Sequence, residues 1–209
     1  MVRRQARRGG ISDPTVLDAV AAVPREEFVP PQLRAEAYDE RALPIGRGQT
    51  ISQPVVVSMM TEALELDPDD AVLEVGTGSG YQAAVLRRLV SSVVTIERDH
   101  ELAERARATF DRLGVDGIEV HVGDGTLGWP DGAPYDAIVV TAGGPDVPDA
   151  LRHQLAPGGR LVLPVGPRGA ERLLLLRRAE DGSWEQPEDL GAVSFVPLVG
   201  DQGWPDRTG

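Results

Sequence analysis

The sequence predicts an α/β fold: a doubly wound, mostly parallel sheet with an antiparallel end and an N-terminal helical addition. Three observations lead to this class. From Ala71 onward, short apolar runs alternate with helical stretches, which is typical of strands wound with helices on both faces. A glycine-rich segment closes the first apolar run, and acidic residues end the second run and follow the third. With 209 residues and no internal repeat, we expect one domain with a full hydrophobic core.

Residues 1–70 have the pattern of helices and loops. Four arginines lie within the first ten residues, and we interpret this segment as a short solvated tail, with a phosphate-binding arm as the alternative. A helix is expected from Pro14, with Ser12 or Asp13 as its cap. A second helix is expected to begin around Pro54, because apolar residues follow it at helical spacing.

Residues 71–166 form the expected cofactor-binding core, and residues 167–209 an antiparallel end and a tail. The predicted strands of the core are 71–75, 92–97, 118–122, 135–141 and 160–165. The predicted helices between them are 81–90, 100–113, which Gly114 ends, and 147–155. Beyond the core, 171–179 and 190–198 are predicted to pair antiparallel across the turn-rich segment 180–189.

Composition excludes several classes of chemistry. The chain has no cysteine, which removes disulfides, thiolate metal sites and thiol nucleophiles, and all 21 basic residues are arginine, which removes catalytic lysines. A formal net charge of -12 disfavours nucleic acid and anionic membranes as partners. No apolar run approaches the ~18 residues of a membrane span, so we expect a cytoplasmic protein.

The glycine-rich segment is the first candidate binding site. Gly76, Gly78 and Gly80 follow the first predicted strand and precede a helix, where backbone N–H groups can meet a polar ligand. Their G-x-G-x-G spacing differs from the G-x-G-x-x-G of dinucleotide-binding folds. Glu74, just before the loop, would repel a pyrophosphate but suits a ligand with positive charge. A merely tight turn is the alternative.

Two further acids complete this candidate site. Glu97 lies 21 residues after Gly76 at the end of the second strand, where a carboxylate can accept from both ribose hydroxyls. Asp124 follows the third strand and can accept from an adenine amino group. A solvated strand end and a plain turn are the alternatives for these two acids. Together the residues describe an adenosine held without phosphates, which fits S-adenosylmethionine. Residues 71–166 thus resemble the class I methyltransferase (Rossmann-like) fold.

A second motif lies upstream, in the polar, glycine-rich loop 43–54. Ser52 or Gln53 can cap the helix that begins at Pro54. A serine at this place can equally hold a carboxylate against the helix start, and the two roles can coexist.

With this loop, the chain closely resembles the protein-L-isoaspartate O-methyltransferase family over nearly its whole length. The most specific motif is Gln49-Thr50-Ile51-Ser52-Gln53-Pro54; the others are Val23-Pro24-Arg25, Phe28-Val29-Pro30, Gly123-Asp124-Gly125, 155–161, 164–166 and Phe195-Val196-Pro197-Leu198. The resemblance implies that Ser52 is the active-site serine and that its loop covers both cofactor and substrate. It also implies that the last two strands run in an order unlike that of most class I enzymes.

On this basis we predict methylation of the free α-carboxylate of L-isoaspartyl residues in damaged proteins and peptides, with repair through a succinimide. Ser52 is the predicted catalytic residue, and Ile51 and Ser52 are the predicted substrate contacts. The predicted cofactor contacts are Thr50, Gln53, Glu74, Gly76, Thr77, Gly78, Ser79, Gly80, Glu97, Arg98, Asp124, Gly125 and Thr141. His100, His121 and His153 have no ligand spacing, so we expect no metal, and we expect a monomer.

The chemistry needs no general base, because an α-carboxylate with a pKa of about 3.3–3.7 is already ionised at neutral pH. The protein has to align the carboxylate with the methyl donor and exclude water. Three alternatives stay open: a relative that modifies an aspartate of a biosynthetic peptide, a nicotinamide-dependent oxidoreductase, which the glycine spacing disfavours, and a binding module without catalysis.

Overall fold

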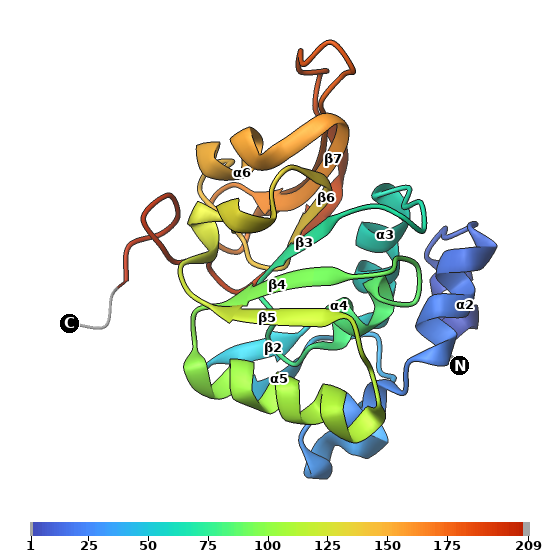
Figure 1. Ribbon diagram of the computed structural model, residues 1–209. Helices are drawn as coiled ribbons and strands as arrows, with labels where there is room; N and C mark the ends of the chain where they lie inside the picture. The colour runs from blue at the N-terminus through green and yellow to red at the C-terminus, as the bar shows by residue number, and fades with distance from the viewer. Residues whose placement is uncertain (1, 207–209) are drawn as a thin grey trace.

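The computed structural model describes residues 2–206 and contains the predicted sheet (Figure 1). Seven strands follow the order β5-β4-β3-β6-β7-β8-β9. The first five in this order are parallel, and β8 and β9 are added antiparallel at one end. The strands are β3 Val72–Val75, β4 Val93–Glu97, β5 Ile118–Val122, β6 Tyr135–Val140, β7 Leu155–Val165, β8 Glu171–Arg177 and β9 Glu188–Val193.

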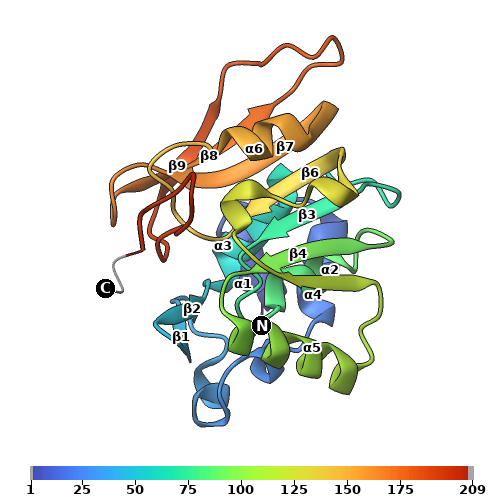
Figure 2. The same ribbon diagram turned by 60° about the vertical axis from the view of Figure 1, so that its left-hand side comes forward.

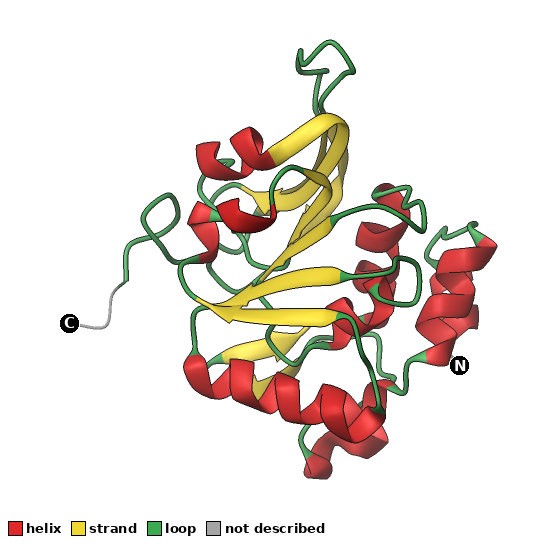
Figure 3. Ribbon diagram, viewed as in Figure 1, coloured by secondary structure: helices red, strands yellow, loops and turns green. Residues whose placement is uncertain are grey.

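Helices cover both faces of the sheet, as Figure 3 shows. Alternate residues of a strand point to opposite faces, so Val72 and Leu73 belong to different cores. The larger core lies under α2 Pro14–Ala22, α3 Pro54–Ala63, α4 Tyr81–Leu86 and α5 His100–Leu113. The smaller core lies under α6 Asp149–Gln154. This confirms the doubly wound class.

The N-terminal segment departs from the prediction. Residues expected to form a solvated tail form the helix α1 Val2–Arg8, which contacts α2 and α3. Ala6 is fully buried and shares a small core with Ile11 and Leu17, and Arg3 pairs with Asp18 at 2.5 Å. The arginines are therefore the exposed face of a packed helix. The α2 cap is as expected, since Asp13 accepts from the Thr15 amide at 2.7 Å.

The glycine-rich loop 43–54, called the acceptor loop from here on, contains more regular structure than its composition indicates. It contains an antiparallel hairpin, β1 Leu43–Gly46 and β2 Gln49–Ile51, shown in Figure 2. Positive φ angles at Gly46, Arg47 and Gly48 make its turn. The hairpin follows two short 3₁₀ helices, η1 Arg25–Phe28 and η2 Pro31–Glu36.

Element boundaries were predicted unevenly. Helix α5 spans the predicted residues, with Asp99 as N-cap and Gly114 at φ 65° as C-cap. Helix α4 ends four residues before the predicted end, β7 begins five residues early, and β9 leaves the sheet at Val193. Two further 3₁₀ turns, η3 Gly125–Leu127 and η4 Pro130–Gly132, precede β6. Within residues 2–206, no helix is long and apolar enough to cross a membrane.

Candidate active site

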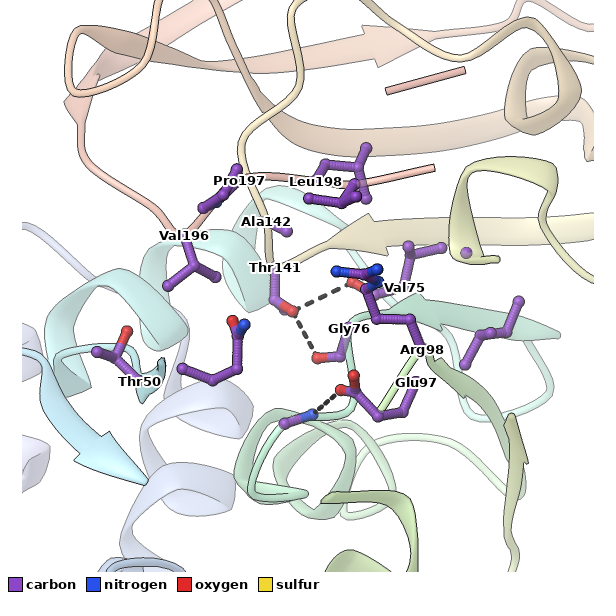
Figure 4. A pocket seen from close by; sticks show the side chains of 15 residues that line it. Thr50, Val75, Gly76, Glu97, Arg98, Thr141, Ala142, Val196, Pro197 and Leu198 are labelled. Atoms are coloured by element: carbon purple, nitrogen blue, oxygen red, sulfur yellow. Dashed lines mark hydrogen bonds between the residues drawn. The ribbon is translucent and has the colours of Figure 1, made fainter. Parts of the chain in front are cut away.

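The candidate site lies at the carboxyl ends of β3, β4 and β6. The chain leaves β3 toward β4 on one side and returns to β6 on the other, and ligands of open α/β sheets bind in the crevice at such a switch point. A cavity lies at this switch point (Figure 4), and we call it the first cavity. It is lined by Gln49, Thr50, Val75, Gly76, Gly78, Ile96, Glu97, Arg98, Gly125, Thr141, Ala142, Val196, Pro197, Leu198 and Val199.

The glycine loop forms the floor of this cavity. Gly76, Gly78 and Gly80 have φ angles of 99°, 53° and 87°, which side-chain-bearing residues rarely adopt. A Cβ at position 76 would lie 2.4 Å from Oγ1 of Thr141, so no side chain fits there. A Cβ at position 78 would meet only Ile45 Cδ1, at 3.5 Å, and Gly76 O, at 3.9 Å. The backbone at Gly78 is therefore open to close approach by a ligand.

Glu97 holds this loop from the neighbouring strand. It is 6% exposed, its Oε2 accepts from the Gly78 amide at 2.8 Å, and its Oε1 accepts from the Asp99 amide at 3.0 Å. Each carboxylate oxygen can accept a further hydrogen bond, and Glu97 lines the cavity. Thr141 holds the loop from β6, because its hydroxyl lies 2.6 Å from Gly76 O (Figure 4).

Asp124 does not line this cavity. Its Oδ1 accepts from the Thr126 amide at 2.9 Å, and its Oδ2 accepts from the Asp201 amide at 2.7 Å. The C-terminal turn packs so closely here that a Cβ at Gly200 would lie 2.0 Å from Oδ1. The carboxylate lies instead in a neighbouring hollow with Arg98, which pairs with Asp206. The predicted contact with adenine stays a prediction.

A second, smaller cavity adjoins the first and contains the predicted catalytic serine. The two cavities share Thr50, Gly76, Gly78 and Thr141. The second is lined in addition by Ile51, Ser52, Val57, Glu74, Thr77, Ser79, Tyr81 and Gln82. Thus the acceptor loop and the glycine loop, which are distant in the sequence, meet around one space.

Ser52 is half-buried, and its hydroxyl makes no hydrogen bond with any residue of the described chain. The N-cap of α3 is Gln53, and its side chain makes no capping bond either. The predicted N-cap position is therefore confirmed for Gln53, but neither Ser52 nor Gln53 makes a capping hydrogen bond through its side chain. The helix begins at Pro54, and the Val56 amide at its third position donates to the Gln53 carbonyl at 3.1 Å. Gln53 lines neither of the two cavities.

Glu74 is fully buried beneath the glycine loop. Its Oε2 accepts from the Thr95 hydroxyl at 2.6 Å, and the hydroxyls of Thr95 and Thr77 lie 2.7 Å apart. Burial raises the pKa of Glu74 to about 8, opposed by the Thr95 hydrogen bond and reinforced by the charge of Glu97. At neutral pH the free site therefore favours the protonated acid, whereas the sequence suggested a permanent negative charge. A cationic ligand would favour its ionisation.

The sequence reasoning missed the C-terminal wall of the first cavity. Val196 O accepts from the Gly143 amide at 2.8 Å, and the Leu198 amide donates to Gly143 O at 2.8 Å. These bonds hold the segment 196–199 against the loop after β6. The motif Phe195–Leu198 was visible in the sequence, but nothing local showed which loop it would meet. Within residues 2–206, no three His, Asp or Glu side chains are grouped to hold a metal ion.

Comparisons with known proteins point to one family. The family model for protein-L-isoaspartate(D-aspartate) O-methyltransferase matches residues 1–203. The chain is 54% identical over 208 residues to the protein-L-isoaspartate O-methyltransferase of Pelotomaculum thermopropionicum, covering 100% of this chain and 90% of that one. It is 55% identical over 204 residues to the Methanoculleus marisnigri protein of the same name, covering 98% and 92%.

Solved structures agree in fold. A protein-L-isoaspartate O-methyltransferase structure superimposes with a TM-score of 0.85 at 30% identity, covering 97% of this chain and 66% of that one. A Plasmodium falciparum structure in complex with S-adenosyl-L-homocysteine has a TM-score of 0.80 at 22% identity, covering 95% and 96%.

Proposed function

The chain belongs to the protein-L-isoaspartate(D-aspartate) O-methyltransferase family, and from this premise we propose that it methylates the free α-carboxylate of L-isoaspartyl residues, with S-adenosylmethionine as donor. The methyl ester initiates repair of damaged proteins and peptides through a succinimide. The observation that carries the proposal is the meeting of Ser52 and the glycine loop around one cavity.

The residues present fit this cofactor. The loop is open at Gly78, where a Cβ would have no neighbour closer than 3.5 Å. Oε1 of Glu74 is buried without a hydrogen-bond partner, so it suits a positively charged group. We assign the adenosine half to the first cavity, where Glu97 can accept from ribose hydroxyls, and the amino-acid half to the second. When bound, S-adenosylmethionine supplies a methyl group on a sulfonium cation.

In the proposed mechanism the protein positions reactants and performs no proton transfer. The substrate carboxylate is ionised at neutral pH and is already a nucleophile. The free hydroxyl of Ser52 donates to one carboxylate oxygen, which leaves the other oxygen directed at the methyl carbon. Thr50 and Ile51 hold Ser52 on the end of the β2 strand, and the segment 196–199 excludes water from the cofactor side.

Labelled S-adenosylmethionine and a pair of peptides test the proposal. The peptides share one sequence and differ only in an isoaspartyl or a normal aspartyl linkage. We expect base-labile label on the isoaspartyl peptide alone. Equal labelling of both peptides would refute the repair assignment, and would favour the related enzymes that modify ordinary aspartate. Absence of label on either would favour a binding module.

Three further parts of the proposal rest on the sequence. We propose that the enzyme acts as a monomer in the cytoplasm, and that it binds no nucleic acid, which the net charge of -12 disfavours. From the sequence we also propose that residues 1–209 form one domain. Light scattering of the purified enzyme tests whether it is a monomer.

A further inference from the structure

The cavity under Ser52 contains two buried oxygen acceptors without partners. Glu74, from β3, is 0% exposed, and Gln82, from the first turn of α4, is 6% exposed. Oε1 of each side chain lies buried without a hydrogen bond, and both side chains line this cavity. The amide of Ala83 lies close enough to Glu74 to favour its ionised form, but makes no hydrogen bond of good geometry to it. Buried acceptors of this kind require a donor.

The orientation of the Gln82 amide is settled by its neighbour Thr61. The Thr61 hydroxyl donates its single proton to Val57 O, at 2.8 Å. Its oxygen can therefore only accept from Gln82, whose Nε2 lies 2.9 Å away. A flipped amide would place two acceptors against each other. Oε1 of Gln82 accordingly faces away from Thr61, and the Gln82 side chain lines the cavity.

When Glu74 is ionised, which a cationic ligand favours, two acceptors around one small space select a donor-rich, positively charged group. A carboxylate would meet the oxygens of Glu74 and Gln82 with unfavourable electrostatics, so the reacting group of the substrate is excluded from this place. Tyr81 also lines this cavity, but its hydroxyl interacts with the Arg25 guanidinium and does not change this preference. An ammonium group, with three N–H donors, matches the arrangement.

We propose that Gln82 is a further cofactor-binding residue, whose Oε1 accepts a hydrogen bond from the α-ammonium group of S-adenosylmethionine, beside Glu74. This inference rests on the proposed function, because S-adenosylmethionine as the cofactor is part of that proposal. A molecule that extends along the glycine loop from Glu97 passes the shared residues Gly76 and Gly78 and ends at Glu74 and Gln82. Thr61 is then a positioning residue that acts through Gln82.

Binding of two ligands to three variants tests the inference. The ligands are S-adenosylhomocysteine and its analogue that lacks the α-amino group, and the variants are Gln82→Met, Thr61→Val and the control Gln154→Met. Gln154 is also a buried glutamine, 8% exposed, but its amide bridges Trp129 N and Leu127 O away from both cavities. Isothermal titration calorimetry gives each dissociation constant, and a thermal melt shows that each variant is folded.

We expect Gln82→Met to weaken S-adenosylhomocysteine binding about tenfold or more, as for the loss of a hydrogen bond to a charged group. Affinity for the analogue without the amino group should stay within about twofold. Thr61→Val should also weaken binding of S-adenosylhomocysteine but not of the analogue, by a smaller factor. The Gln82 amide is still present in this variant but is no longer oriented by the Thr61 hydroxyl. Gln154→Met should change neither affinity.

Other outcomes overturn the inference. If Gln82→Met weakens the binding of both ligands equally, Gln82 is a structural residue. If both affinities are unchanged and KM for the isoaspartyl peptide is raised, Gln82 is a substrate contact. If Gln82→Met does not fold, Thr61→Val decides between the same outcomes. The proposed function fails separately: a wild-type protein that does not bind S-adenosylhomocysteine refutes both, whereas one that binds it and methylates isoaspartyl peptide refutes neither.

Discussion

The glycine loop and the acceptor loop line the same space but differ in how their polar groups are used. In the glycine loop, the Gly76 amide donates to Ile96 O at 2.8 Å and the Gly78 amide donates to Glu97. In the acceptor loop, the Ser52 hydroxyl has no partner within residues 2–206. We therefore interpret the glycine loop as preorganised for the cofactor by internal bonds, and the acceptor loop as keeping a donor free for the substrate.

The largest expected effect comes from a substitution that removes the hydrogen bonds holding the glycine loop. Glu97→Ala removes the acceptor of the Gly78 and Asp99 amides as well as the proposed ribose contact. We expect cofactor affinity to fall about 10- to 100-fold, as for loss of a charged hydrogen bond, measured by calorimetric titration. The control is Asp136→Ala, which removes an acceptor of the Ala71 amide at the opposite end of the sheet. An unchanged dissociation constant for Glu97→Ala would remove this residue from the site.

An intermediate effect concerns the buried acid under the glycine loop. The pKa of Glu74 is raised from its ordinary value of 4.5 to about 8, so between these pH values the folded protein holds a proton that the unfolded chain has lost. Stability from this group therefore falls as the pH rises from 4.5 to 8.

The matched variant for this prediction is Glu74→Gln, which cannot titrate. Urea titration gives the free energy of unfolding of both proteins. The value for Glu74→Gln minus the value for wild type should increase as the pH rises from 4.5 to 8. Below pH 4.5 the difference between the two proteins should become constant. A difference that does not vary between pH 5 and pH 8 would show that Glu74 titrates normally.

The smallest effect concerns the link between α5 and the acceptor hairpin. Arg105 donates to Ile45 O at 3.0 Å and is otherwise largely exposed. Arg105→Met should lower the free energy of unfolding by about 0.5–1.5 kcal/mol, the net value of one hydrogen bond. We expect KM for the isoaspartyl peptide to rise a few-fold, because the hairpin loosens, with cofactor affinity unchanged. A loss of cofactor affinity instead would contradict the separation of the two regions.

The same comparison explains what could be predicted from the sequence. Helix α5 was predicted to the residue, and Gly114 at its end is a local signal, to which the structure adds Asp99 as N-cap. Gly76, Gly78 and Glu97 line one cavity, and their proximity could be expected because strand ends in a parallel sheet meet at one edge. In contrast, α1 is helical because α2 and α3 cover Ala6, which no pattern in the first ten residues could show.

Partners distant in the sequence decided the remaining differences. The spacing placed Asp124 after β5, but its Oδ2 is taken by the Asp201 amide, 77 residues further along the chain. The freedom of the Gln82 oxygen depends on Thr61, 21 residues earlier and on another helix. Such pairings depend on how helices and loops pack in three dimensions, and the sequence alone held no signal for them.

In the proposed function, Ser52 is kept free to orient the substrate carboxylate. Single-turnover methylation of an isoaspartyl peptide by Ser52→Ala, at saturating cofactor and beside a thermal melt, tests it most directly. Because Ser52 makes no capping bond, we expect an unchanged melting temperature. We expect a methyl-transfer rate lower by about tenfold or more, or about 1.4 kcal/mol of barrier. A wild-type rate in the variant, with or without a lower melting temperature, would contradict the claim.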